Sequence, residues 1–462
     1  MRSPQPELGS FRDPAGFVFR RDEVLYRQVE DLHRSDYELL RSSGLCDVLV
    51  ASELLIPHEE VDVEPVGPTA YRVLRPEQVG FISYPYEWCF SQLRDAALTT
   101  LRLQSIAMDH GMSLRDASAY NIQFHHGHPV LIDTLSFEAI PEGRPWAAYR
   151  QFCQHFLAPL ALMSYRDVRL GQLLRDHIDG VPLDLAVRLL PRRARFRPPL
   201  LLHLFLHSRS QRRHRGDTAP AGDRAPKMSV NALRGLLDSL RNAVEHLKTP
   251  IASVGWSAYD DEVDHYGAAG TRSKEAAVEA FIQEVSPRTV WDLGANVGRF
   301  SRLASTRGIP TIAFDLDPDC VEASYQRVRG EGDRGLLPLV LDLANPSPAI
   351  GWANEERMTL AQRGPADLCL ALALVHHLAI GNNVPLPRIA RFLAEISRWA
   401  VVEFVPKGDE KVSILLLNRE DIFPEYTVEG FERAVAPWFE VHRRAEITGS
   451  GRVLYLLKTR DP

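Results

Sequence analysis

The residues best suited to chemistry lie in the second half of the chain, in the run TVWDLGANVGRFSRLAS from Thr289 to Ser305. Val290 to Leu293 predicts a buried strand, and Gly294 to Gly298 predicts a tight loop that leads into a helix. Glycines at such a turn let the backbone approach a ligand closely, and the first turn of the helix offers free N–H groups. The run therefore predicts a ligand-binding loop. It does not by itself identify the ligand, because dinucleotide-binding proteins use a similar loop.

Acidic residues follow the next two predicted strands. The apolar run 310–314 ends at Asp315 and Asp317, and the run 336–341 ends at Asp342. Asp315 lies about twenty residues past the glycine loop, where a carboxylate can accept hydrogen bonds from both hydroxyls of a ribose. The order of loop and carboxylate therefore favours a ligand that contains a nucleoside.

Two histidines and a glutamate are the candidate catalytic residues. His376 and His377 come just after a fourth predicted strand, 367–373, at the edge where ligands bind in parallel sheets. Either histidine could act as a general base, or both could instead orient the loop or pack beneath a ligand. Glu403 lies within a fifth predicted strand, 400–405, where a buried structural hydrogen bond is an equal alternative to a catalytic role.

The elements that must position these residues alternate between short apolar runs and helical patterns. Such alternation is typical of a doubly wound α/β fold, in which helices cover both faces of a mostly parallel sheet. A helix is expected over 274–284 before the first strand. The runs 439–443 and 452–457 predict a closing strand pair after the last parallel strand.

With these motifs in order, residues 256–459 resemble the class I methyltransferases, which use S-adenosylmethionine (SAM). The resemblance implies a Rossmann-like fold and SAM as cofactor. The loop DLGANVG would hold the methionine and ribose, Asp315 the ribose diol, and Asp342 the adenine amino group. The segment from Ala373 to His377 would line the pocket beside the methyl group. The implied cofactor-binding residues are Asp292, Gly294, Asn296, Gly298, Asp315, Asp317, Asp342 and Ala373.

The main alternative ligand for this loop is NAD. The dinucleotide fingerprint is G-x-G-x-x-G, and GANVGR does not fit it. Methyltransferases often have a glycine where this chain has Asn296, but asparagine tolerates positive φ better than most residues. The aromatic-rich stretch containing Trp256, Tyr259, His265 and Tyr266 precedes the motif, and it predicts either a lid over the cofactor or an aromatic core.

The N-terminal half carries a second pattern. Asp116, Asn121 five residues later and Asp133 after an apolar run have the spacing of the catalytic loop of kinases and small-molecule phosphotransferases. A helix over 90–110 precedes the loop, and residues 16–27 predict a hairpin. We therefore expect a kinase-like α+β domain over residues 15–207.

This second resemblance has clear departures. Leu114 replaces the usual His or Tyr, and Asp133 is followed by Thr-Leu rather than Phe-Gly. No lysine precedes Lys227, so only Arg21 or Arg27 could take the phosphate-binding role, and arginine is not equivalent to lysine there. A degenerate binding domain, an active kinase and an unrelated helical domain with turn-forming aspartates all stay open.

Composition restricts the remaining possibilities. The net charge of −6 and the absence of an aromatic-basic patch argue against nucleic acid as a partner. Five scattered cysteines without metal-ligand spacing predict no disulfide framework and no metal site. The longest apolar stretch, 199–207, is too short to span a membrane and predicts a buried helix. No signal sequence is evident, so a cytoplasmic location is expected.

These patterns together predict the domain organisation and the function of the chain. We expect the kinase-like domain over 15–207, a disordered basic linker over 208–227, and the methyltransferase domain over 228–462. The predicted function is methyl transfer from SAM to an acceptor, either a small molecule or a glycan- or lipid-type compound. Alternatives are a bifunctional protein whose N-terminal domain binds nucleotide or transfers phosphate, and an RNA methyltransferase.

Overall fold

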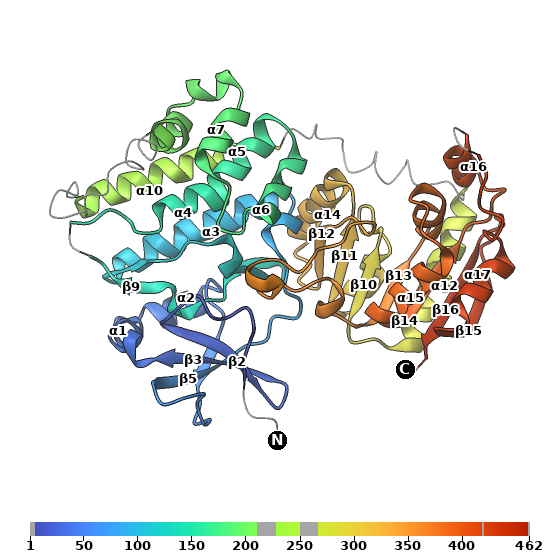
Figure 1. Ribbon diagram of the computed structural model, residues 1–462, viewed down its shortest axis with the longest axis horizontal. Helices are drawn as coiled ribbons and strands as arrows, with labels where there is room; N and C mark the ends of the chain where they lie inside the picture. Colours follow the sequence, from blue (N-terminus) through green and yellow to red (C-terminus); the bar gives the residue numbers. More distant parts are fainter. Residues whose placement is uncertain (1–4, 142, 210–227, 250–266, 418–419, 461–462) are drawn as a thin grey trace. The chain divides into compact units, whose positions relative to one another are not determined.

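A computed structural model describes residues 5–141, 143–209, 228–249, 267–417 and 420–460 (Figure 1). The chain forms two compact units. The N-terminal unit comprises residues 1–250 together with 350–357, and the C-terminal unit comprises residues 251–349 and 358–462. Within the N-terminal unit, the guanidinium of Arg12 donates two hydrogen bonds, of 2.8 and 2.6 Å, to the carboxylate of Glu356.

The N-terminal unit begins with a five-stranded antiparallel sheet in the order β1-β2-β3-β5-β4. The predicted hairpin is β2 and β3, joined at Asp22 and Glu23, which both have positive φ. The strands and helices of this part are β1 (Gln5–Pro6), β2 (Gly16–Arg21), β3 (Val24–Glu30), η1 (Asp31–His33), α1 (Arg34–Ser42), α2 (Leu45–Ala51), β4 (His58–Glu60) and β5 (Ala70–Pro76).

The rest of the N-terminal unit is mainly helical and is built around the long helix α3 (Phe90–Asp109). Two short hairpins follow α3: β6 (Met112–Leu114) pairs with β9 (Phe137–Ala139), and β7 (Ile122–His125) pairs with β8 (His128–Leu131). The α+β class predicted for this half is therefore confirmed. The other elements are η2 (Pro85–Glu87), η3 (Ala119–Asn121), η4 (Thr134–Ser136), α4 (Tyr149–Phe152), η5 (Cys153–Leu157), α5 (Ala158–Tyr165), η6 (Val168–Gln172), α6 (Leu173–Asp176), α7 (Leu183–Leu189), η7 (Arg192–Phe196), α8 (Pro198–Leu200), η8 (Leu201–Leu206) and α10 (Val230–Glu245).

Helix α10 changes the predicted boundary between the two halves. The sequence placed residues 228–250 in the C-terminal domain, whereas the structure places α10 in the N-terminal unit, in contact with α3. Its apolar stripe supplies the reason, because Leu233, Leu237 and Leu240 are buried there and the Arg234 guanidinium pairs with Asp109 of α3 at 2.7 Å. Most of the predicted linker, residues 210–227, lies outside the described residues.

The apolar stretch 199–207 is helical, as predicted, but only half of it is buried. Its main part is the π-helix η8, in which His203, Leu204 and Phe205 are buried while Leu201 and Leu202 are exposed. Among the described residues, no helix has the combination of length and apolar character that crossing a bilayer requires.

The C-terminal unit contains a seven-stranded sheet in the order β12-β11-β10-β13-β14-β16-β15. Strands β10 to β14 are parallel, β16 runs antiparallel to β14, and β15 runs antiparallel to β16. This is the predicted Rossmann-like sheet with its antiparallel closing pair. The strands are β10 (Val290–Leu293), β11 (Thr311–Asp315), β12 (Leu336–Val340), β13 (Ala366–Ala371), β14 (Ser397–Phe404), β15 (Phe439–Glu446) and β16 (Val453–Thr459).

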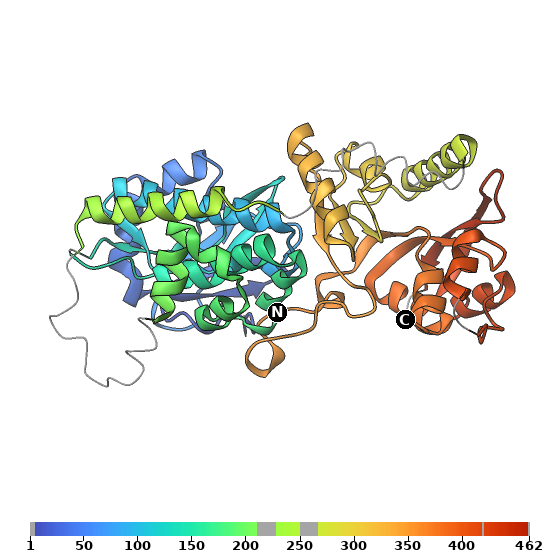
Figure 2. The same cartoon turned by 90° about the horizontal axis from the view of Figure 1, so that it is seen from above.

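Helices cover both faces of this sheet, yellow and gold on one side and orange to red on the other (Figure 2). On the first face, Val278, Phe281 and Ile282 of α12 pack with Leu368 and Val401 of the sheet in one buried cluster. The helices are α12 (Gly267–Val285), α13 (Ser301–Ser305), α14 (Pro318–Glu331), η10 (Ala361–Arg363), η11 (His377–Gly381), α15 (Leu386–Ile396), α16 (Glu410–Leu416) and α17 (Val428–Val435); η9 (Trp352–Asn354) belongs to the N-terminal unit.

The topology fixes where a ligand would bind in the C-terminal unit. The strand order reverses between β10 and β13, because the chain leaves β10 toward β11 and later returns to the other side of β10. In open α/β sheets, ligands bind at the carboxyl ends of the strands beside such a reversal. The glycine loop follows β10 and the histidine pair follows β13, so the predicted site residues flank this switch point.

Candidate functional site

The glycine loop has the backbone conformation that its sequence predicts. Gly294, Asn296 and Gly298 have φ values of 76°, 51° and 79°. A Cβ atom at Gly298 would lie 3.0 Å from the hydroxyl of Ser324, and this approach is tighter than side chains normally allow. The expectation that Asn296 can replace a glycine at positive φ is therefore met, with its side-chain oxygen accepting the Val297 N–H at 2.7 Å.

Asp315 is held against this loop by backbone groups. The N–H of Asn296 donates to one carboxylate oxygen at 2.7 Å, and the N–H of Asp317 donates to the other at 2.9 Å. Burial raises the pKa of Asp315, and these hydrogen bonds oppose that shift. Each oxygen has a second lone pair, so the carboxylate keeps acceptor capacity for a ligand beside the loop.

Asp292 lies below the loop at the end of β10 and is 1% exposed. The hydroxyl of Ser301 donates to its carboxylate at 2.6 Å, which ties the strand to helix α13. Burial raises the pKa of Asp292 to about 6, partly offset by Ser301 and by the charge of Lys274. The carboxylate thus supports the loop from inside the fold.

Two other predicted cofactor residues make local contacts. Asp317 caps helix α14 by accepting the N–H of Asp319 at 2.9 Å, and Asp342 accepts the N–H of Ala344 at 2.8 Å just after β12. Both carboxylates therefore shape turns at the carboxyl ends of their strands. Ala373, after β13, has a φ of 50°, and neighbouring Leu374 lies 3.4 Å from the point where a Cβ on Gly294 would be. The segment after β13 therefore faces the glycine loop.

The two histidines have different environments. His376 is 1% exposed, and within the described residues its Nδ1 has no hydrogen-bond partner. Burial, aided by His377 and Arg452, lowers the pKa of His376 to about 3, so its imidazole is neutral at physiological pH. The ring of His377 lies 4.2 Å from that of His376 and is exposed. Desolvation and the charge of Lys411 also lower the pKa of His377.

Glu403 is fully buried and paired with two cations. The Lys274 ammonium lies 2.7 Å from one carboxylate oxygen, and the Arg452 guanidinium lies 3.3 Å from the other. Arg452 also binds Asp409 through contacts of 2.6 and 3.0 Å. Burial lowers the pKa of Lys274, and Glu403 opposes that shift. This network favours the structural alternative for Glu403 over a role as general base.

Sequence reasoning missed Lys274 and Arg452. Lys274 opens the predicted helix 274–284, and Arg452 opens a predicted strand, so each resembles an ordinary surface cation at an element end. Only the fold brings both to Glu403, where they are 3% and 4% exposed. The aromatic lid predicted around Trp256 and Tyr266 lies outside the described residues.

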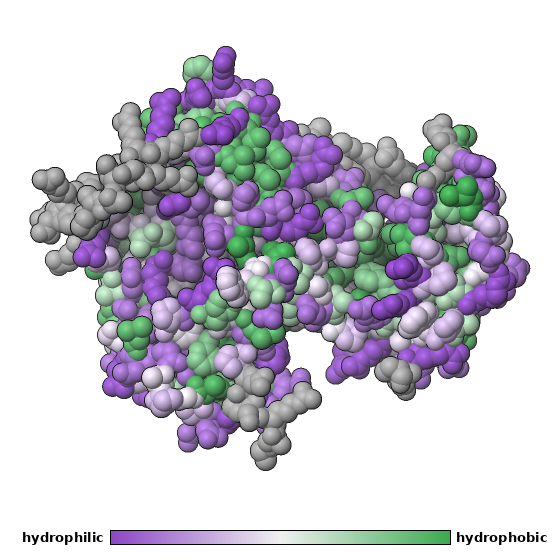
Figure 3. All heavy atoms as spheres, in the orientation of Figure 1, coloured by the Kyte–Doolittle hydropathy of each residue, from purple (hydrophilic) through white to green (hydrophobic). Residues whose placement is uncertain are grey.

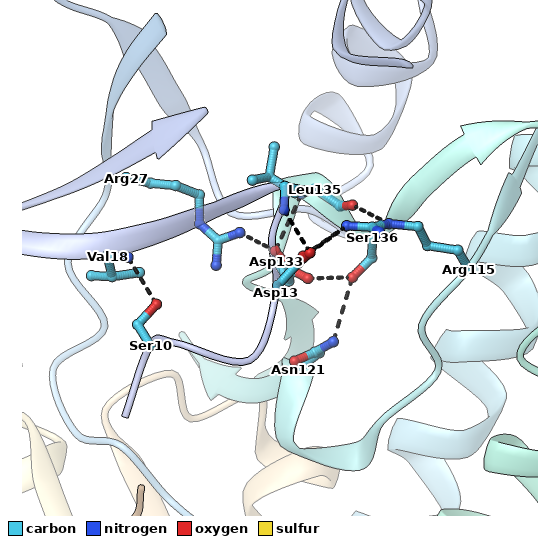
Figure 4. A network of polar contacts seen from close by, with 10 residues as sticks. Ser10, Asp13, Val18, Arg27, Arg115, Asn121, Asp133, Leu135 and Ser136 are labelled. Carbon is cyan, nitrogen blue, oxygen red and sulfur yellow. Dashed lines mark hydrogen bonds and ion pairs between the residues drawn. The ribbon is translucent and has the colours of Figure 1, made fainter. Parts of the chain in front are cut away.

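The kinase-like pattern in the N-terminal unit also converges in space, and Figure 4 shows two of its residues, Asn121 and Asp133. Asp116 and Asp133 interact electrostatically, and the amide of Asn121 lies 3.4 Å from the hydroxyl of Ser136, which donates to Asp133 at 2.6 Å. Burial raises the pKa of Asp116, and the charge of Asp133 adds to the rise. The three residues singled out by spacing thus form one cluster.

Arg27 is the cation that completes this cluster. It lies on β3, and its guanidinium forms a close ion pair with Asp133, as Figure 4 shows. Burial works to raise the pKa of Asp133, but Arg27, Ser136 and the Leu135 N–H outweigh it, so the net shift is downward. Of the two arginines that the sequence offered, Arg27 reaches the site and Arg21 instead pairs with Glu64.

Comparison with known proteins gives one extensive relative. No family model matches the chain. The nodulation protein NoeA of Rhizobium meliloti strain 1021 is 36% identical over 465 residues, which cover 98% of this chain and 96% of NoeA. The chain belongs to the NoeA family. The alignment with NoeA includes both units, so the two-unit arrangement falls within the family's shared length.

Solved structures show only remote likeness. WbdD, described as a bifunctional kinase-methyltransferase, is 15% identical with a TM-score of 0.30, and the match covers 45% of this chain and 43% of WbdD. Magnesium protoporphyrin IX methyltransferase (ChlM) of Synechocystis PCC 6803 is 16% identical with a TM-score of 0.30 and coverages of 41% and 84%. The chain's own loop, strand order and carboxylates are what bear out its resemblance to class I methyltransferases.

Proposed function

We propose that the C-terminal unit of this NoeA-family protein is a SAM-dependent methyltransferase. The carrying observation is the contact between the Asn296 N–H and the Asp315 carboxylate, at 2.7 Å, beside the topological switch point. This contact holds the Asp315 carboxylate against the glycine loop, and that position supports a role for Asp315 in binding the two ribose hydroxyls. The family resemblance assigns these two features to SAM.

The residues present fit this cofactor. Asp315 has acceptor capacity left after its two backbone hydrogen bonds, and Asp342 stands at the end of the next strand, where the resemblance expects the adenine amino group. Gly294 and Gly298 have positive φ, which favours glycine, and because glycine has no side chain these positions leave room for the methionine end of the cofactor. When bound, SAM supplies a methyl group attached to a positively charged sulfur.

The protein's part in such a transfer is chiefly to position an acceptor in line with the methyl group and to exclude water. A base is required only if the acceptor must lose a proton. A neutral His376 with a free Nδ1 lone pair, or the exposed His377 beside it, could accept that proton. The low pKa of His376 makes it a weak base, so we favour His377 for acceptors that need deprotonation.

We infer that the acceptor is a small molecule with an apolar portion, of glycan or lipid type. Helix α16 packs against η11, whose first residue is His377; Ile414 on α16 and Leu417 just after it are 49% and 74% exposed. Green residues mark this helix in Figure 3. These exposed apolar side chains, on and just after a helix that packs against η11, favour such an acceptor over nucleic acid, in keeping with the net charge of −6.

Calorimetric titration of SAM into the full chain tests the proposal. Wild type should bind, and Asp315→Ala should weaken binding at least about tenfold, since a charged acceptor of hydrogen bonds is lost. Glu331→Ala is the matched control, because Glu331 is an exposed carboxylate on α14 that pairs only locally with Arg327. Failure of wild type to bind, or equal binding by Asp315→Ala, would overturn the proposal.

A second candidate function is nucleotide binding by the N-terminal unit. The convergence of Asp116, Asn121 and Asp133 favours it, because carboxylates and an amide at this spacing hold metal-bound phosphates in phosphotransferases. The ion pair between Arg27 and Asp133 speaks against phosphate transfer, since Asp133 must give up Arg27 before it can bind a metal ion. We therefore propose binding without phosphotransfer for this unit.

A further inference from the structure

A cluster of metal-binding side chains lies in the N-terminal unit, outside the sites described above. The imidazoles of His125 and His126 and the carboxylate of Glu77 each point one donor atom to a common position, with all three atoms within 4.8 Å of one another. Both Nε2 atoms lie near the same carboxylate oxygen of Glu77, at 3.1 Å for His125 and 3.4 Å for His126.

These separations match a tetrahedral metal site. With metal–ligand bonds of about 2.05 Å, as zinc forms with histidine and carboxylate, tetrahedral geometry places neighbouring ligand atoms roughly 3.3 Å apart. The two nitrogen–oxygen distances bracket that value. Two histidines and one carboxylate are also a ligand set that zinc accepts while leaving a fourth position open. Two of the three donor separations therefore suit a zinc ion, and the third, between the two histidine nitrogens, is within 4.8 Å.

The turn that presents the histidines is itself unusual. Strands β7 and β8 are joined by a two-residue turn in which His126 and Gly127 have φ values of 49° and 81°, and His125 pairs with His128 across it. Turns with positive φ at both central residues strongly prefer Asn-Gly or Asp-Gly. Here a histidine occupies the first central position, which favours Asn or Asp. Residues in strained backbone conformations are often found at binding sites, so this choice of residue is consistent with a ligand at the turn.

We propose that Glu77, His125 and His126 form a zinc site, with water in the fourth position. Glu77 directly follows β5, the strand beside β3 and β4 in the N-terminal sheet. The bound ion would fasten the β7–β8 hairpin to the end of that strand. Because β7 begins next to Asn121 and β8 ends two residues before Asp133, the ion would also steady the two ends of the kinase-like cluster.

The sequence alone does not predict this site, because its ligands are two histidines and a distant glutamate and not regularly spaced cysteines. His125, His126 and His128 form a conspicuous HHGH run, but Glu77 lies 48 residues away along the chain from His125. Within the described residues, this is the group of three or more metal-ligating side chains that the fold assembles. The exposure of Glu77 and His126 leaves the open position accessible to solvent.

Zinc titration into the untagged full chain, stripped of metal with a chelator, tests the proposal. We expect one zinc ion per chain and a raised unfolding temperature on binding. His126→Asn is the decisive variant, because it creates the preferred Asn-Gly turn and so keeps the hairpin while removing a ligand. Its affinity for zinc should fall at least about tenfold, with the unfolding temperature of the metal-free protein unchanged or higher.

His246→Asn is the matched control, since His246 is an exposed histidine at the end of α10 that bonds only its own helix backbone. It should bind zinc as wild type does, and Glu77→Gln should behave like His126→Asn. The proposal is overturned if metal-free wild type binds no zinc. It is equally overturned if His126→Asn binds as tightly as wild type, or if His246→Asn loses binding to the same degree.

Discussion

Replacing Lys274 by methionine should strongly destabilise the C-terminal unit. Lys274 and Glu403 are 3% and 0% exposed, and their charged atoms lie 2.7 Å apart. The substitution would remove the shorter of the two ion pairs described for the buried Glu403 and leave the 3.3 Å contact to Arg452, which is shared with Asp409. Breaking a buried pair from one side costs about 3–5 kcal/mol, because an uncompensated charge stays in the interior.

For a unit of this size, such a loss corresponds to a fall in unfolding temperature of about 6–20 °C. Urea denaturation followed by circular dichroism measures the free energy directly. The double variant Lys274→Met with Glu403→Leu should recover most of the loss, because apolar replacement of a buried pair is often neutral or stabilising. Arg452 keeps its two contacts to Asp409 in that variant.

The same pair of variants decides the role of Glu403. If Glu403 is structural, the stable double variant should retain SAM binding and methyl transfer. A double variant that folds and binds SAM but transfers no methyl group would show that Glu403 takes part in catalysis. A cost of less than about 1 kcal/mol for Lys274→Met alone would refute the reasoning, because the pair would then be no more than a typical surface ion pair.

Two further predictions concern the other buried charges. The pKa of Asp292 is raised to about 6, so the proton that it binds stabilises the folded state at low pH. This stabilisation is lost as the pH rises from about 4 through 6, and the loss amounts to roughly 3 kcal/mol at neutral pH. In urea denaturation at a series of pH values, Asp292→Asn should remove this part of the pH dependence, and an unchanged profile would contradict the raised pKa. Arg27→Ala should free Asp133 and strengthen magnesium-dependent nucleotide binding to the full chain, measured by calorimetry with a non-hydrolysable ATP analogue; equal binding by wild type and variant would mean that the ion pair does not block the metal position.

Local pattern was enough to predict the C-terminal sheet. Strands β10 to β13 are short, mainly apolar runs that each adjoin a glycine or a proline, and buried parallel strands require such runs on both faces. The predicted and observed ends of the strands near Val290 and Thr311 differ by at most one residue. The glycine loop and Asp315 were predictable because their chemistry depends on residues close together in sequence.

Long-range pairing was not predictable in the same way. Glu403 was singled out from its strand, but its partners are Lys274 of α12 and Arg452 just before β16, so this pairing of charges emerges only after folding. The zinc cluster has the same character, since Glu77 meets the histidines through pairing of distant segments. In the N-terminal unit, spacing identified Asp116, Asn121 and Asp133, but only the fold distinguishes Arg27 from Arg21 as their partner.

The position of α10 changes the interpretation of the basic stretch 208–227, which the sequence predicted to be the linker between the two domains. Because α10 packs on α3, residues 210–227 connect two parts of one unit, and the chain first passes to the C-terminal unit near residue 250, before its return for residues 350–357. The sequence predicts a connector in this stretch, and the entropic cost of closing a loop grows only with the logarithm of its length, so a change in its length should cost little stability. Among relatives, insertions and deletions should therefore accumulate there, while the length of α10 and its apolar stripe should be preserved. A fragment ending at residue 207 would expose the α3 surface that α10 covers.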